Sequence, residues 1–121
     1  MKSTELGVIE SRFADLVWQN APLSSRDLVS LCEKHLAWKK STTYTVLKKL
    51  CDRGLFQNNG GTVEVVITKE EFTAIQSEEI VRETFSGSLP AFVAAFTSRN
   101  ALTDDEIAAL QSLIDAQKRN S

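Results

Sequence analysis

The chain has 121 residues, of which 42% are hydrophobic and 25% charged, with a formal net charge of −2. These values fit one globular domain, or a small domain with an accessory element, and argue against non-specific nucleic-acid binding by the chain as a whole. The longest apolar stretch, AFVAAF at 91–96, falls far short of the roughly 18 residues that a membrane helix needs, and no apolar signal region follows Met1. We therefore expect a cytoplasmic protein that does not associate with membranes.

Charge divides the chain into two parts. Residues 1–69 contain ten basic and seven acidic residues and sum to +3, whereas residues 70–121 contain four and nine and sum to −5. Different surfaces of this kind predict different roles. The expected domains are therefore residues 1–69 and residues 70–121.

Two amphipathic helices are predicted at the start of the chain. Apolar residues recur at steps of three and four as far as Trp18, and Asn20-Ala21-Pro22 breaks the pattern. Ser24, with Asp27 three residues on, predicts the N-terminal cap of a second helix, because the hydroxyl can accept a backbone N–H. The apolar stripes contain Leu6, Ile9, Phe13, Leu16 and Val17 in the first helix, and Leu28, Leu31 and Cys32 in the second.

The segment WKKSTTYTVLKKLCDRG at 38–54 predicts a third helix, which Gly54 closes in the left-handed conformation. Two β-prone stretches, Leu55-Phe56 and residues 62–68, then flank Asn58-Asn59-Gly60-Gly61, which is a strong hairpin signal. Three helices followed by a two-stranded hairpin is the order of a winged helix-turn-helix. The predicted fold class is therefore mainly α with a small β-hairpin (α+β), with a winged helix-turn-helix over residues 1–69.

The third helix has two chemically different sides when its residues are placed at 100° intervals. Thr43, Val46, Leu47 and Leu50 centre on one side. The opposite side carries hydroxyls that can approach base edges and lysines that can neutralise phosphates, as a recognition helix requires. The alternative is a solvated polar face without a ligand. The polar side contains Ser41, Thr42, Thr45, Lys48, Lys49 and Asp52.

Three short helices with apolar faces are predicted in residues 70–121. Their expected caps are Thr68 with Glu71, Ser88, and Thr103 with Glu106. Such helices cannot readily close a core of their own in so short a region, so either a second copy or the first part of the same chain is expected to cover their apolar faces. The dimerisation residues expected from these faces are Phe85, Leu89, Phe92, Val93, Phe96, Ile107, Leu110, Leu113 and Ile114.

Metal and catalytic sites are not expected. Cys32, His35 and Cys51 are too few ligands for a structural zinc site, and the chain has no further Cys or His. We expect the two cysteines to be reduced thiols inside the fold. A nucleophile motif and a Gly-rich phosphate loop are both missing from the sequence. The sequence therefore predicts a protein that is not an enzyme and has no cofactor.

The chain resembles a known family through residues across nearly its whole length, namely residues 6–18, Trp38, Thr42, Leu47, Leu50 and Gly54, FSGSL at 85–89, and LTDDEIAALQSLI at 102–114. The resemblance is to the penicillinase-repressor family of winged-helix transcriptional repressors. It implies a bacterial homodimer that binds the double-stranded DNA of a palindromic operator and dimerises through its C-terminal helices. The DNA-binding residues that it implies are Lys39, Lys40, Ser41, Thr42, Thr45, Lys48, Lys49 and Arg53.

The chain departs from the family pattern at two places. The segment after the wing turn, Gly61 to Val66, has no basic residue. Ala95-Phe96 stands where the antibiotic-responsive members have an Asn-Phe cleavage site, so we expect a different inducing signal. The other function left open by the sequence is a winged-helix protein-interaction module that does not bind DNA.

Overall fold

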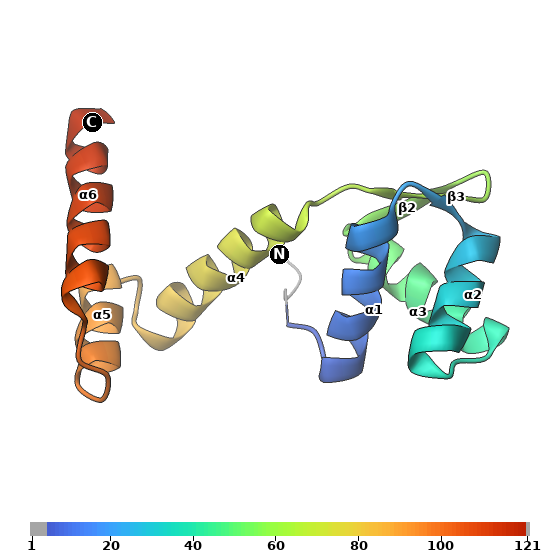
Figure 1. The fold of residues 1–121 in the computed structure, drawn as a ribbon, viewed down its shortest axis with the longest axis horizontal. Coiled ribbons are helices and arrows are strands. Elements are labelled where there is room, and N and C mark those ends of the chain that lie inside the picture. The colour runs from blue at the N-terminus through green and yellow to red at the C-terminus, as the bar shows by residue number, and fades with distance from the viewer. Residues whose placement is uncertain (1–4, 121) are drawn as a thin grey trace. The chain divides into compact units, whose positions relative to one another are not determined.

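The structure is a computed structural model that describes residues 5–120. It divides into a first compact unit that ends at Glu79 and a second that begins at Ile80. Figure 1 shows the elements in chain order. They are α1 (Val8–Asn20), β1 (Leu23–Ser24), α2 (Ser25–Leu36), α3 (Lys40–Asp52), β2 (Phe56–Asn59), β3 (Thr62–Val65), α4 (Lys69–Thr84), α5 (Leu89–Thr97) and α6 (Asp104–Asn120).

The first unit is a winged helix, which confirms the predicted fold class. Its sheet has three strands in the order β1-β3-β2, all antiparallel, where the sequence predicted only the two strands of the hairpin. The additional strand is β1, in which Leu23 pairs with Val63 and Ser24 with Thr62. A strand of two residues shows no alternation of its own, and its partner lies far along the chain. The sequence pattern therefore could not reveal it.

The wing turn is shorter than the sequence suggested. Asn58 and Asn59 belong to β2, so the turn consists of Gly60 and Gly61, whose φ values are 61° and 95°. A two-residue hairpin turn of type I′ requires positive φ at both central residues, and glycine meets this requirement without steric strain. The Asn58 side chain accepts a hydrogen bond from the Gly61 N–H at 3.0 Å, which closes the turn.

The core of the first unit lies between the three helices and the sheet. Phe13 is fully buried and stacks on Trp38, with ring centroids 5.5 Å apart. Ile9, expected on the same apolar stripe, is 51% exposed, because the buried part of α1 begins at Phe13. The other buried apolar residues are Ala14, Val17, Leu28, Cys32, Leu47, Leu50, Leu55, Phe56, Val63 and Phe72.

The start of α4 is packed on the winged helix. The Trp18 ring lies 5.6 Å from the rings of both Phe56 and Phe72, and its indole N–H donates to the Ile67 carbonyl at 3.0 Å. Lys69 also forms an ion pair with Asp15 at 2.9 Å. Phe72 therefore belongs to the first unit. For this part of α4, the sequence had left open that the helix packs on the first part of the same chain, and it does.

The predicted helix caps are present. Ser24 accepts from the Asp27 N–H at 3.0 Å, and Ser88 accepts from the Ala91 N–H at 3.1 Å. Two reciprocal capping boxes open the longer C-terminal helices, one at α4 and one at α6. They join Thr68 with Glu71 and Thr103 with Glu106.

The second unit contains α5 and α6, which together line an apolar groove. Among the described residues of these two helices none is buried, although both carry large apolar side chains. The Phe85 and Phe92 rings meet edge to face at 5.5 Å. Over the described residues, no helix is long and apolar enough to cross a membrane.

Candidate nucleic-acid interface

Helix α3 is held in the first unit by its apolar side. Thr43, Leu47 and Leu50 are buried, and the Thr43 hydroxyl donates to the Lys39 carbonyl at 3.3 Å. The Tyr44 hydroxyl donates to the Ser25 hydroxyl at 3.2 Å, which links α3 to the first residue of α2. The buried side that the sequence predicted for this helix is therefore confirmed.

The polar side of α3 is exposed along its length. Ser41, Thr42 and Thr45 lie in its first half, and the Thr45 hydroxyl donates to the Ser41 carbonyl at 2.9 Å. That bond uses the hydroxyl proton and leaves oxygen lone pairs available to an external donor. Lys39 and Lys40 are exposed at the helix start, with the Lys40 ammonium 5.9 Å from the Tyr44 ring centroid. Hydroxyls and two cations thus share one accessible surface.

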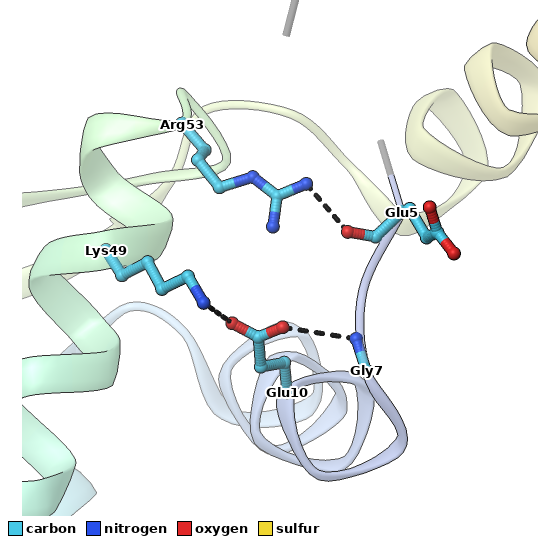
Figure 2. A network of polar contacts seen from close by, with 5 residues as sticks. All are labelled: Glu5, Gly7, Glu10, Lys49 and Arg53. Atoms are coloured by element: carbon cyan, nitrogen blue, oxygen red, sulfur yellow. Dashed lines mark hydrogen bonds and ion pairs between the residues drawn. The ribbon is translucent and has the colours of Figure 1, made fainter. Parts of the chain in front are cut away.

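The three basic residues of the second half of α3 and its C-terminal cap have contacts inside the chain. Lys48 pairs with Asp52 at 3.1 Å, one helical turn away. Lys49 pairs with Glu10 of α1 at 2.7 Å. The half-buried Arg53 donates to the Glu5 carbonyl at 2.8 Å, as Figure 2 shows. The sequence predicted these cations as phosphate ligands and did not predict their internal partners.

Glu10 is the centre of this network (Figure 2). One carboxylate oxygen accepts from the Gly7 backbone N–H at 3.1 Å and the other accepts from Lys49. The hydrogen bond from Lys49 is the main cause that lowers the pKa of Glu10, and the Gly7 N–H lowers it further. Residues 5–7 and the C-terminal part of α3 lie on either side of an open groove. It is lined by Glu5, Leu6, Gly7, Thr45, Lys48, Lys49, Asp52 and Arg53.

The lowered pKa of Glu10 predicts an acid-sensitive contribution to stability. Because the folded-state pKa lies below the unfolded one, this contribution is complete above the ordinary glutamate pKa and is lost as the pH falls through the folded value. Glu10→Gln should therefore destabilise the protein by roughly 0.2–1 kcal/mol at pH 7, the range for a partly exposed ion pair. The difference in thermal midpoint from the wild type should shrink toward pH 3.

Glu33→Gln provides the control for this measurement, since Glu33 is exposed on α2 and the change removes the same charge. Thermal unfolding of all three proteins, followed by circular dichroism at several pH values, gives the comparison. A Glu10→Gln deficit that stays constant from pH 7 to pH 3 would contradict the assigned ion pair.

The wing, which is the hairpin of β2 and β3, has a neutral to acidic exposed edge. Thr62 is exposed next to the turn, and Glu64 accepts a hydrogen bond from the Gln57 side chain at 2.8 Å. No basic residue lies between Gly60 and Val66. We therefore place no cationic phosphate contact on the wing.

The cysteines and the histidine do not converge on a ligand site. Cys32 is buried and Cys51 partly buried, and burial raises the pKa of both thiols, which favours the unreactive protonated form. In the part of the chain that the structure describes, no three His, Cys, Asp or Glu side chains are grouped as metal ligands would be.

A winged helix whose third helix buries one side and exposes hydroxyls and lysines on the other is the architecture of helix-turn-helix transcriptional regulators. The family model for the penicillinase repressor matches residues 6–116. The chain belongs to the penicillinase repressor family, whose members are transcriptional repressors and not enzymes.

Two known proteins are similar to this chain. The penicillinase repressor of Bacillus licheniformis is 21% identical over 121 residues, which cover 97% of this chain and 94% of that protein. The crystal structure of the multiple antibiotic-resistance repressor (MarR) from Listeria monocytogenes is 16% identical, with a TM-score of 0.47, and covers 98% of this chain and 78% of that one.

Proposed function

We propose that this repressor is a homodimer that binds a palindromic operator through α3. The observation that carries the proposal is the exposed surface formed by Ser41, Thr42 and Thr45 together with the lysines at the helix start. Hydroxyls can hydrogen-bond base edges in the major groove, while lysines near them bind phosphate and fix the register. The proposed DNA-binding residues are Lys39, Lys40, Ser41, Thr42, Thr45, Lys48, Lys49 and Arg53.

The proposed dimer forms through the C-terminal helices. Leu89, Phe96, Leu113 and Ile114 are all at least half exposed, which is unfavourable for apolar side chains of a chain that stays alone in water. Twofold pairing is the commonest way to bury such faces. We assign DNA binding to residues 1–69 and dimerisation to residues 70–121, and expect operator half-sites about 34–36 Å apart.

A gel-shift titration against random genomic fragments at several salt concentrations tests the function. A DNA-binding repressor retains a small set of palindromic fragments, and its affinity falls as salt rises, because its lysines displace counterions from phosphate. If no fragment is retained at any salt concentration, the protein is instead a winged-helix interaction module.

The two kinds of exposed side chain should affect binding differently. Thr42→Ala and Thr45→Ala should change base preference, by roughly 1–3 kcal/mol at the contacted base pair, with little change in salt dependence. Lys48→Ala should weaken binding to all sequences alike and flatten the salt slope by about 0.9. Lys34→Ala on α2 is the control, since Lys34 is exposed outside the proposed interface.

Competition binding with a set of single-base operator variants measures both effects. Equal loss of base preference in the threonine and lysine variants would show that the roles on α3 are misassigned. Loss of affinity by Lys34→Ala as large as that by Lys48→Ala would show that the interface extends beyond the proposed residues.

A further inference from the structure

We infer that Glu10 competes with DNA phosphate for Lys49. By pairing with Lys49, the Glu10 carboxylate lowers the affinity of α3 for DNA. The inference rests on the proposed function and adds a residue outside the recognition helix to the determinants of binding. Glu10 lies on α1, yet its carboxylate is 2.7 Å from the ammonium of a proposed phosphate ligand. A carboxylate and a phosphate oxygen are chemically similar partners for a lysine.

The two partners differ in how freely they can move. The Lys49 side chain is 58% exposed, whereas that of Glu10 is only 20% exposed. Glu10 is also fixed by the Gly7 N–H, through its second carboxylate oxygen. Lys49 can therefore turn toward an approaching phosphate, while the carboxylate stays at the edge of α3.

The hydrogen bond of Arg53 to the Glu5 carbonyl strengthens this arrangement. It joins the segment before α1 to the end of α3 at a second point, 2.8 Å from donor to acceptor (Figure 2). The Glu10 carboxylate is thus held beside the recognition helix by contacts that do not depend on Lys49. Releasing Lys49 does not remove the negative charge.

Competition for Lys49 lowers the DNA affinity whichever partner the ammonium keeps. If Lys49 turns to phosphate, the ion pair with Glu10 is lost; if it bridges both groups, its charge is already offset. A Lys49 that stays shared with Glu10 neutralises less of the phosphate charge, so the number of counterions released from DNA falls toward that of a protein lacking Lys49. The Lys48–Asp52 pair differs, because its side chains are 78% and 61% exposed, so solvent screens this ion pair more strongly than the Lys49–Glu10 pair.

Glu10→Gln separates this role from the structural one. The glutamine oxygen can still accept from the Gly7 N–H, as glutamine does in capping boxes, but it has no charge to pair with Lys49. Fluorescence anisotropy with a selected operator fragment and an unrelated duplex, at 50–200 mM salt, should show roughly 2- to 5-fold tighter binding to both. The salt slope should steepen by about 0.9.

Two further comparisons complete the design. Glu33→Gln removes the same charge from an exposed site on α2 and should leave both affinities closer to those of the wild type. In a chain that already carries Lys49→Ala, Glu10→Gln should increase the DNA affinity no more than Glu33→Gln does. Lys49→Ala alone should weaken binding less than Lys48→Ala, a comparison that holds even if Glu10→Gln impairs folding.

The results distinguish the possible failures. Wild-type protein that binds no DNA at any salt overturns the proposed function together with this inference. Wild-type protein that binds, with Glu10→Gln equal to Glu33→Gln in affinity and salt slope, overturns this inference alone. So does a loss of affinity by Lys49→Ala as large as that by Lys48→Ala.

Discussion

Replacing Phe96 and Leu110 with aspartate is expected to convert the proposed dimer into a monomer and to lower its affinity for a palindromic operator by about 100- to 10,000-fold. Both side chains line the groove of α5 and α6 and are 50% and 39% exposed. Unpaired carboxylates at a buried interface lose their hydration without gaining partners, so the paired state becomes unfavourable. The affinity gained by binding two half-sites at once is then lost.

Sedimentation at micromolar concentration and anisotropy titration measure the two effects. Ser112→Asp is a matched control, because Ser112 is exposed on α6 about 200° around the helix from Leu110. This variant should remain a dimer and bind as the wild type does. A double aspartate variant that still sediments at twice the chain mass, or a monomer that keeps full operator affinity, would contradict the assigned dimer face.

The features predicted correctly from the sequence depend on residues close together in the chain. The caps at Ser24 and Ser88 and the capping box of Thr103 with Glu106 each involve a side chain and a backbone group three residues apart. The two sides of α3 follow from helical periodicity alone. Gly54 has a φ of 90°, as its place after the helix predicts. Local geometry determines all of these, so one sequence is sufficient to recognise them.

The features that were missed depend on contacts between distant residues. The spacing of Gly7 and Glu10 could have suggested a cap, but nothing near Lys49 indicates that Glu10 would be its partner. Strand β1 exists only because β3 lies beside it. Ile9 matches the apolar stripe of α1, and its exposure depends on where the packed neighbours end. Helical periodicity predicts the direction in which a side chain points, but it does not predict which residues that side chain contacts.

Helix α3, the proposed recognition helix, also depends on α1, through a contact near the first turn of α3. Trp38 lies two residues before α3, and the fully buried Phe13 stacks on it at 5.5 Å. This stack fixes the turn between α2 and α3, from which Lys39 and Lys40 emerge. We therefore expect substitutions of Phe13 to affect both the stability of the first unit and the position of the proposed DNA-binding surface.

Phe13→Ala is expected to destabilise the protein by about 3–5 kcal/mol, because it removes a fully buried ring and leaves a cavity beside Trp38. This is a large part of the roughly 5–15 kcal/mol that holds a typical domain folded. Urea unfolding at one fixed protein concentration, followed by tryptophan fluorescence and by circular dichroism, measures the loss. A fixed concentration is needed because the proposed dimerisation would add to the apparent stability.

Val8→Ala tests whether the Phe13 effect comes from burial, because Val8 is an apolar residue of the same helix that is 78% exposed. It should change the free energy of unfolding by no more than about 0.5 kcal/mol. DNA affinity of Phe13→Ala should fall even at temperatures where most of the protein is folded, since the missing ring no longer fixes Trp38 before α3. If a folded Phe13→Ala protein keeps wild-type DNA affinity, the stack stabilises the fold without positioning the proposed recognition helix. If the loss of stability is below about 1 kcal/mol, the assigned packing of Phe13 in the core is contradicted.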